Sequence, residues 1–114
     1  MAITYFQDTI FQTDSALEAP GVGTALKVAV NNTFNTKDYT LLVTVASINT
    51  NVKVSLEGSI DGTNYAEIIS EKTITTNSTT VYNVANTPVR WIRPRFISEA
   101  GGTAATVVFS IAAS

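Results

Sequence analysis

Apolar and polar residues alternate with a period of two over several stretches of the chain, which is typical of β-strands that bury one face. In residues 52–60, valine, leucine, glycine and isoleucine occupy every second position, with lysine, serine and glutamate between them. Residues 25–30 and 106–111 alternate in a similar way. The β-branched residues threonine, valine and isoleucine are abundant, and they suit a pleated strand better than a helix. The pattern therefore predicts several short strands.

Residues 41–45 (Leu-Leu-Val-Thr-Val) are apolar on both faces, which predicts a central strand covered on both sides. Residues 61–64 (Asp-Gly-Thr-Asn) predict a tight turn, because Asp accepts bonds from the backbone ahead of it and Gly tolerates a positive φ. Further turn signals lie at residues 20–23, 76–79 and 99–102. Short strands separated by such turns indicate an all-β fold, either a single antiparallel β-sandwich or a jelly-roll-like barrel.

The first 20 residues have a different pattern, in which aromatic residues are interspersed with polar ones at neither strand nor helix spacing. We therefore divide the chain into an N-terminal arm or edge segment, residues 1–20, and a β-sandwich domain, residues 21–114. The segment is either an edge strand with a loop packed on the domain, or an arm whose aromatic residues are buried against a neighbouring subunit. In the second case Tyr5, Phe6 and Phe11 would make that contact.

The chain has 114 residues, of which 14% are charged, and it contains neither Cys nor His. Without these residues it cannot form disulfides, Cys/His zinc sites or catalytic arrangements that use a thiolate or an imidazole. Nothing in the spacing of its nine acidic residues places two carboxylates in a cleft, as a glycosidase would need. We therefore expect a non-enzymatic protein with no catalytic residues, no cofactor and no metal site.

The formal net charge is −2, so the chain lacks the basic face that nucleic-acid binding usually requires. No apolar run approaches the roughly 18 residues of a membrane-spanning helix, and the N-terminus lacks the pattern of a signal peptide. We expect neither nucleic acid nor a membrane as a partner. A polar surface with few charges is suited instead to contacts with other proteins.

All three arginines of the chain lie in residues 90–96, and an extended backbone points three side chains of this segment to one face: Trp91, Arg93 and Arg95. Arg and Trp are the residue types most enriched among those that dominate the energy of protein interfaces. Pro94 has no N–H for a ladder hydrogen bond, which predicts an edge strand or a bulge at this point.

Three interpretations of this basic segment remain open. The arginines can form cross-strand salt bridges to Glu57 or Glu67, with their aliphatic stems covering the sheet. They can also belong to a protein–protein interface. A third interpretation is that Trp91 stacks on single-stranded nucleic acid or carbohydrate, which the acidic net charge weakens for nucleic acid.

Residues 56–65 contain a Gly-Ser-Ile-Asp-Gly-Thr-Asn-Tyr motif, residues 89–96 read Val-Arg-Trp-Ile-Arg-Pro-Arg-Phe, and a Gly-Gly pair opens residues 101–109. Together these segments resemble small β-sandwich virion proteins of tailed bacteriophages. In that group a G-S-x-D-G-x-N-aromatic hairpin precedes a V-R-aromatic-x-R-x-R strand and a Gly-rich final hairpin. The resemblance covers residues 54–112 and is greatest to the capsid decoration (cement) proteins. Pro94 departs from it, because the pattern usually has a β-branched residue there.

The resemblance implies a structural protein that binds the outer capsid surface and stabilises the head by bridging capsid subunits. Its partners would be the major capsid protein and copies of itself, with a homotrimer favoured. It would be made in the host cytoplasm and located on the capsid surface of the virion. The candidate interface residues are Tyr5, Phe6, Phe11, Trp91, Arg93 and Arg95.

Two alternatives accompany this hypothesis. The first is a tail, adaptor or baseplate component of the virion, since such proteins share the sandwich pattern. The second belongs to another class, a carbohydrate-binding module that uses Trp91 with Tyr65 or Tyr82 as stacking platforms.

Overall fold

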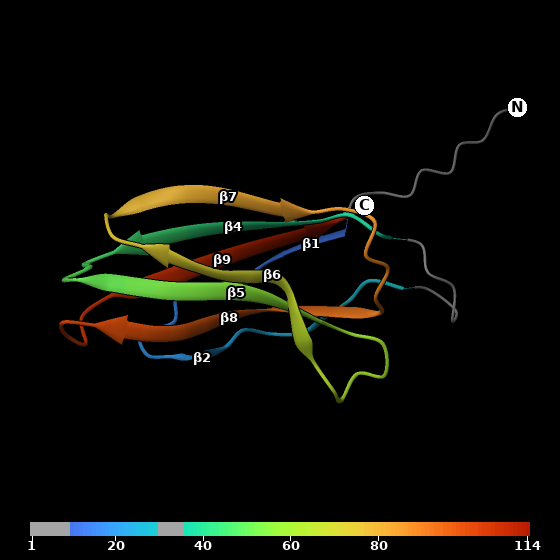
Figure 1. Ribbon diagram of the computed structural model, residues 1–114, viewed down its shortest axis with the longest axis horizontal. Helices are drawn as coiled ribbons and strands as arrows, with labels where there is room; N and C mark the ends of the chain where they lie inside the picture. Colours follow the sequence, from blue (N-terminus) through green and yellow to red (C-terminus); the bar gives the residue numbers. More distant parts are fainter. Residues whose placement is uncertain (1–9, 30–35) are drawn as a thin grey trace, which may run out of the picture.

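The computed structural model describes residues 10–29 and 36–114, and in these residues it shows two antiparallel β-sheets packed face to face (Figure 1). The described residues form no helix, so none is present that could span a membrane. The predicted all-β fold is confirmed as a sandwich of two sheets, and the two sheets do not close into a barrel.

Each sheet has its own set of strands. Sheet I has the order β1 (Ile10–Thr13), β9 (Thr106–Ala113), β4 (Tyr39–Ala46) and β7 (Ser78–Val84). Sheet II has the order β2 (Gly21–Val22), β8 (Trp91–Ala100), β5 (Asn51–Ser59) and β6 (Ala66–Ile74). The short strand β3 (Leu26–Lys27) also pairs with β8.

The strand pairing is nested about the turn between β5 and β6. Strand β5 pairs with β6, β4 with β7, β2 and β3 with β8, and β1 with β9. The chain therefore resembles one long hairpin that has been folded over on itself. Two further pairs, β4 with β9 and β5 with β8, join its halves into two sheets. This is the strand order of a jelly-roll sandwich.

The hydrophobic core lies between the two sheets and consists of the apolar side chains that point inward from each strand. Its largest fully buried side chains come from both sheets and from the segment after β3: Val28, Tyr39, Leu41, Val43, Val52, Val54, Leu56, Ile92, Phe96, Val107, Phe109 and Ile111. Burial of an aliphatic or aromatic side chain of this size contributes about 1.5–3 kcal/mol. The register of both sheets is fixed by this set, because a slip of one residue would turn it toward water.

The prediction that residues 41–45 are covered on both sides is wrong. Leu41, Val43 and Val45 are buried, but Leu42 is only half-buried and Thr44 is exposed. Strand β4 is central within sheet I, yet the sandwich has only two layers. Its second face therefore forms part of the outer surface.

The prediction of an edge strand or a bulge at Pro94 is also wrong. Strand β8 lies between β5 on one side and the two short strands β2 and β3 on the other. The Pro94 carbonyl accepts a bond from Gly23 N at 2.8 Å. The N–H and C=O groups of one strand residue point to the same side, so the ring nitrogen of Pro94 faces the break between β2 and β3, where no hydrogen bond is needed. A Cβ at Gly23 would lie 2.6 Å from Pro94 Cγ, and only glycine fits there. The shift in register with β5 occurs instead at Ile97.

Residues 10–20 are the described part of the predicted N-terminal segment. Strand β1 forms an edge of sheet I, and Leu17 makes a further antiparallel bridge to Val107. Gly21 and Val22, which lie within the predicted turn 20–23, form β2 instead and pair with β8. The division at residue 20 stays a prediction.

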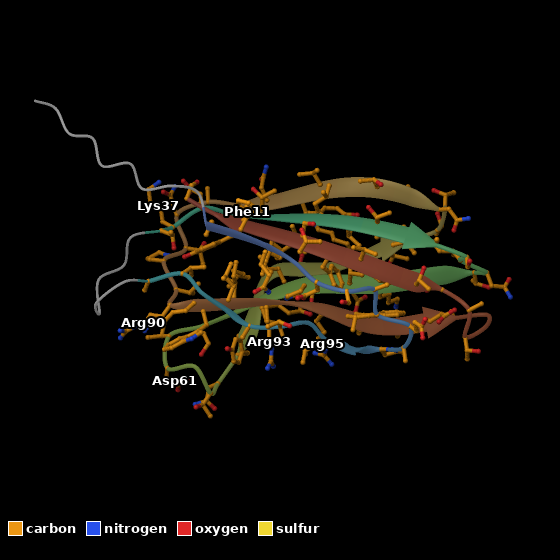
Figure 2. All side chains as sticks on the ribbon, turned by 180° about the vertical axis from the view of Figure 1, so that it is seen from behind. Phe11, Lys37, Asp61, Arg90, Arg93 and Arg95 are labelled. Atoms are coloured by element: carbon orange, nitrogen blue, oxygen red, sulfur yellow. The ribbon has the colours of Figure 1, made fainter. Side chains whose placement is uncertain are left out.

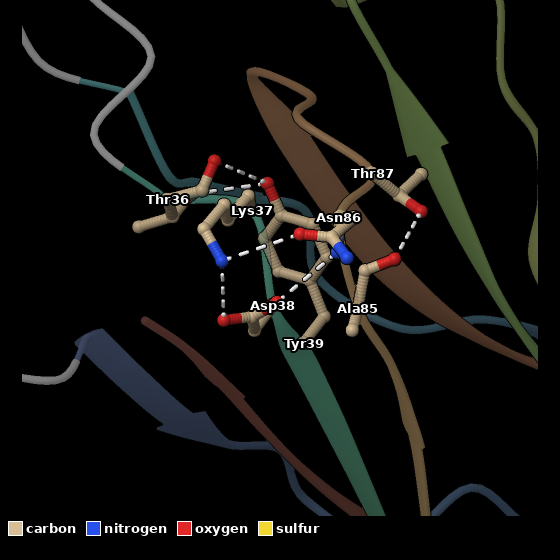
Figure 3. A network of polar contacts seen from close by, with 7 residues as sticks. All are labelled: Thr36, Lys37, Asp38, Tyr39, Ala85, Asn86 and Thr87. Atoms are coloured by element: carbon tan, nitrogen blue, oxygen red, sulfur yellow. Dashed lines mark hydrogen bonds and ion pairs between the residues drawn. The ribbon is translucent and has the colours of Figure 1, made fainter.

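A buried tyrosine hydroxyl connects the loops at one end of the sandwich. Tyr39 is only 1% exposed, and its hydroxyl accepts a bond from Val89 N at 3.1 Å. The same hydroxyl lies 3.1 Å from Thr36 Oγ1, which in turn donates to the Val28 carbonyl at 2.8 Å. One hydroxyl thus satisfies buried polar groups from two segments that are distant in sequence, and Figure 3 shows its contact with Thr36.

A second set of polar contacts joins the same end of the sandwich closer to the surface. Asp38 Oδ1 accepts a bond from Asn86 N at 3.1 Å, and Asp38 Oδ2 pairs with Lys37 Nζ at 3.2 Å (Figure 3). Asn86 has a φ of 56°, a left-handed conformation that Asn tolerates well. These contacts hold the connection between β7 and β8 against the start of β4.

Substitution Tyr39→Phe should lower the free energy of unfolding by about 1–3 kcal/mol, because it removes the partner of the buried Val89 N–H. Urea unfolding followed by tryptophan fluorescence measures this change. Tyr82→Phe is the control, since the ring of Tyr82 is only half-buried and its hydroxyl can stay hydrated. Equal losses in the two variants would contradict the role given to Tyr39.

Candidate protein-interaction surface

Three of the predicted interface residues lie together on the outer face of sheet II. Trp91, Arg93 and Arg95 point outward from β8, while Ile92 and Phe96 on the opposite side are fully buried. The predicted division of this segment into two faces is confirmed. Figure 2 shows Arg93 and Arg95 pointing away from the sandwich on this layer. We call the surface formed by Glu57, Tyr65, Trp91, Arg93 and Arg95 the charged face.

A buried carboxylate organises the two arginines. Glu57 lies directly opposite Arg93 in the β5–β8 register and is 6% exposed. Arg93 Nε donates to Glu57 Oε1 at 2.7 Å, and Arg95 lies 3.4 Å from Glu57 Oε2. The predicted cross-strand salt bridges therefore form, and Glu57 is their acceptor. One carboxylate is shared by two guanidinium groups, and the exposed Glu67 lies opposite Glu57 in the β5–β6 register, so acidic and basic side chains lie side by side on this face.

Arg93 also stacks on an aromatic ring. Its guanidinium carbon lies 3.9 Å from the centre of the Tyr65 ring, within the range of a cation–π contact. Tyr65 follows the turn between β5 and β6, so this turn carries the ring over β8. Because Arg93 is held by both Glu57 and Tyr65, its side chain has lost most of its rotational freedom before any partner arrives.

The ring of Trp91 is partly covered by the same turn. Gly62 has a φ of 81°, and a Cβ at this residue would lie 3.4 Å from three atoms of the Trp91 ring. Two cations flank the ring, with Lys27 Nζ at 5.7 Å and Arg90 Cζ at 5.8 Å from its centre. The backbone of a glycine and two basic side chains thus fix the position of Trp91.

Asp61 holds this turn in place. Its Oδ1 accepts bonds from the backbone N–H groups of Thr63 and Asn64, at 2.8 and 2.7 Å. These bonds stabilise the charged carboxylate and hold the pKa of Asp61 well below its usual value. The predicted turn at residues 61–64 is confirmed, and both oxygens of the carboxylate have donors within the turn.

A shallow groove of ≈ 550 Å³ runs beside the two arginines. Its floor and walls include Pro20, Val22 and Ile97 together with the charged residues Glu57, Arg93 and Arg95. An open groove with guanidinium donors along one side suits a polar segment of another protein better than a small enclosed ligand. Within residues 10–29 and 36–114 there is no group of three or more acidic side chains that could hold a metal ion.

The structure does not bring all predicted interface residues together. Phe11 lies on β1, in the other sheet, and its side chain is 74% exposed on the opposite side of the sandwich (Figure 2). Tyr5 and Phe6 lie outside the described residues. Sequence reasoning named Tyr65 only as a sugar platform and missed its contact with Arg93. The sequence feature that could have revealed this contact is the turn motif directly before Tyr65, which reverses the chain toward β8.

No observation favours the carbohydrate-binding alternative. The Tyr65 ring is stacked by Arg93, and the Trp91 ring is covered in part by Gly62. Tyr82 packs against the core and lies 5.6 Å from Lys72 Nζ. Each proposed platform thus already contacts other parts of the chain, and the three rings are not arranged as one open surface.

Comparison with known proteins identifies a shared fold. The sequence matches no protein-family model, and no curated protein sequence is significantly similar to it. Among solved structures, the prophage-derived protein YomS of the SPBc2 prophage aligns over 100% of both chains with a TM-score of 0.62 and 11% identity. At this identity the similarity concerns the fold alone.

Two further structures align with lower scores. A protein of Bacillus endospore appendages gives a TM-score of 0.44 at 12% identity, over 99% of this chain and 94% of the other. The coat protein of Tobacco streak virus gives 0.42 at 11% identity, over 98% and 89%.

Substitution Arg93→Ala should lower the free energy of unfolding by about 1.5–3 kcal/mol, because it leaves the buried Glu57 carboxylate without its short hydrogen bond. Arg95→Ala should cost less than about 1 kcal/mol, since Arg95 is more exposed and its contact is longer. Adding Glu57→Gln to Arg93→Ala should recover part of the loss. Urea unfolding of the double-mutant cycle measures the coupling, and additive losses would contradict it.

The ionised Asp61 should stabilise the folded protein at neutral pH and lose this effect in acid. Because its pKa is lowered on folding, the stabilisation is complete above the unfolded value of about 4 and declines as the pH falls further. Asp61→Asn should therefore melt at a lower temperature than the unsubstituted protein at pH 7, with the difference shrinking below about pH 4. Melting curves across this range test the prediction, and a difference that is independent of pH would contradict it.

Proposed function

We propose that this chain is a non-enzymatic structural protein of a tailed-phage virion and that it attaches to the outer capsid surface through the charged face. The main observation is the arrangement around Arg93, whose guanidinium is held between the buried carboxylate of Glu57 and the ring of Tyr65. Arg95 and Trp91 extend the same surface along β8. Such a set of fixed arginine and aromatic side chains is suited to recognising another protein.

The physical advantage of this surface is that its side chains lose little conformational entropy when a partner binds. Immobilising a long side chain at an interface costs roughly 0.5–1.5 kcal/mol, and Arg93 is already fixed in the free protein. Arg93 and Arg95 remain 29% and 44% exposed, so both can still donate hydrogen bonds to a partner. The two guanidinium groups favour carboxylate or carbonyl oxygens of a segment of the capsid protein, which the groove beside β2 can receive.

The proposed action is mechanical. Each copy would contact neighbouring capsid subunits, and many copies on one shell would add weak contacts into a strong resistance to the pressure of packaged DNA. The major capsid protein is then the partner, and the capsid surface of the virion is the location. The motif resemblance to decoration proteins supports this proposal, and the fold shared with a prophage-derived protein agrees with it. The resemblance also implies a homotrimer, but attachment through the charged face does not require one.

Binding to phage heads that lack the protein tests the proposal. Arg95→Glu should raise the dissociation constant about tenfold or more, because it reverses a charge on the charged face while leaving the Arg93–Glu57 bond intact. Lys37→Glu is the matched control, since it changes the net charge equally and lies before β4, away from this face (Figure 2). Its binding should change less than about twofold.

Two results would contradict the proposal. Equal head binding by Arg95→Glu and the unsubstituted protein would remove the charged face from the contact. Binding to purified tails with none to heads would replace the capsid role by the alternative of a tail, adaptor or baseplate component. Circular dichroism of each variant shows whether the sandwich is still folded.

A further inference from the structure

Charge is divided unequally between the two sheets. None of the four strands of sheet I contains a charged residue. The strands of sheet II contain nine, with one on β3, two on β5 and three each on β6 and β8. The two outer faces of the sandwich therefore have different chemistry, and only one of them is explained by the proposed capsid contact.

The outer face of sheet I is a regular array of neutral side chains, and we call it the neutral face. Three rows cross it from β9 over β4 to β7: Ala112–Thr40–Asn83, Ser110–Leu42–Val81 and Val108–Thr44–Thr79. Two hydroxyl pairs bond to each other within the face, Thr13 with Ser110 at 2.8 Å and Thr44 with Thr79 at 3.0 Å. Because these hydroxyls already have partners, covering the face leaves fewer polar groups without hydrogen bonds.

The two most exposed apolar side chains of this face lie at its opposite edges. Phe11 on β1 is 74% exposed, and Val81 on β7 is 57% exposed. Phe11 pairs with Ala112 and therefore extends the row that ends at Asn83. Val81 lies at the end of the neighbouring row. A monomer would leave both side chains in water.

We propose that the neutral face binds the neutral face of a second copy of this chain in a two-fold dimer. Two copies of a face without charges can meet without like-charge repulsion and without the desolvation of charged side chains. A two-fold axis parallel to the strands places β1 of one copy over β7 of the other. Phe11 of each copy then covers the Val81 region of its partner, so the exposed apolar groups at both edges are buried.

The area of the face corresponds to a weak, transient dimer. Strands lie about 4.8 Å apart and rise about 3.3 Å per residue, so the four strands of 4, 8, 8 and 7 residues project roughly 430 Å² per copy. Two copies then project about 860 Å², which lies in the range of weak interfaces. The charged faces point outward on both sides of this dimer, so the inference goes beyond the proposed capsid contact and does not rest on it.

The oligomeric state in solution tests this inference. Sedimentation velocity over a range of concentrations should show a monomer–dimer equilibrium for the unsubstituted protein. Val81→Lys should raise the dimer dissociation constant about 100-fold or more, because it places an unpaired charge at each of two equivalent sites. Ile60→Lys is the matched control, since Ile60 is 60% exposed but lies in the turn after β5. Its dimer should be unchanged.

The orientation of the dimer has a separate test. Phe11→Lys and Val81→Glu should each be monomeric alone, while an equimolar mixture should form a heterodimer in which the introduced lysine of one chain contacts the introduced glutamate of the other. This rescue requires β1 to lie over β7, and its failure would overturn the proposed orientation. Both variants should retain the circular dichroism spectrum of the sandwich.

Three outcomes would overturn the inference itself. They are a monomer at every concentration, a trimer as the smallest assembly, or a dimer that Val81→Lys leaves unchanged. If the protein is monomeric and Val81→Lys loses head binding, the neutral face contacts the capsid instead. Failure of the capsid proposal is distinguishable, because it appears in the head-binding assays and not in the sedimentation of the free protein.

Discussion

A sandwich of two sheets buries one face of each sheet, and this constraint determines how the remaining residues of the chain can be used. The inward positions of both sheets must be apolar, and they are filled by valine, leucine, isoleucine and phenylalanine. Every charge carried by a strand must therefore lie outside the core or find a partner. In the described strands all of these charges belong to sheet II, and sheet I has an outer face without charge. The two outer faces can therefore serve different contacts.

The charged face follows directly from the packing of the core. Core residues such as Leu56 and Ile92 fix the register between β5 and β8, and this register places Glu57 opposite Arg93. The carboxylate is buried because the arginine stems and neighbouring strands cover it. Removing either arginine thus affects stability as well as binding, which is why Arg95, with its longer contact, is the better probe of function. Stability and recognition use the same side chains here.

Much of this arrangement was predictable from period-two alternation, which indicated β5, β9 and the two faces of β8. The errors arose where a distant segment decides the outcome. The apolar run at residues 41–45 could be buried on both faces, but a sandwich of two layers covers only one face of this strand. The effect of Pro94 depends on the break between β2 and β3, which lies far away in sequence. The neutral face was not recognised, because it appears only when β1, β4, β7 and β9 are placed side by side.

Side-chain footprinting by oxidation and mass spectrometry would show whether the two faces of the sandwich make separate contacts. The protein would be labelled as a dilute monomer, at high concentration and on phage heads. Oxidation of Phe11 should fall with self-association, whereas oxidation of Trp91 and Tyr65 should fall only on heads. Protection of Trp91 and Tyr65 by self-association, or protection of Phe11 on heads with no change at Trp91, would contradict this expectation.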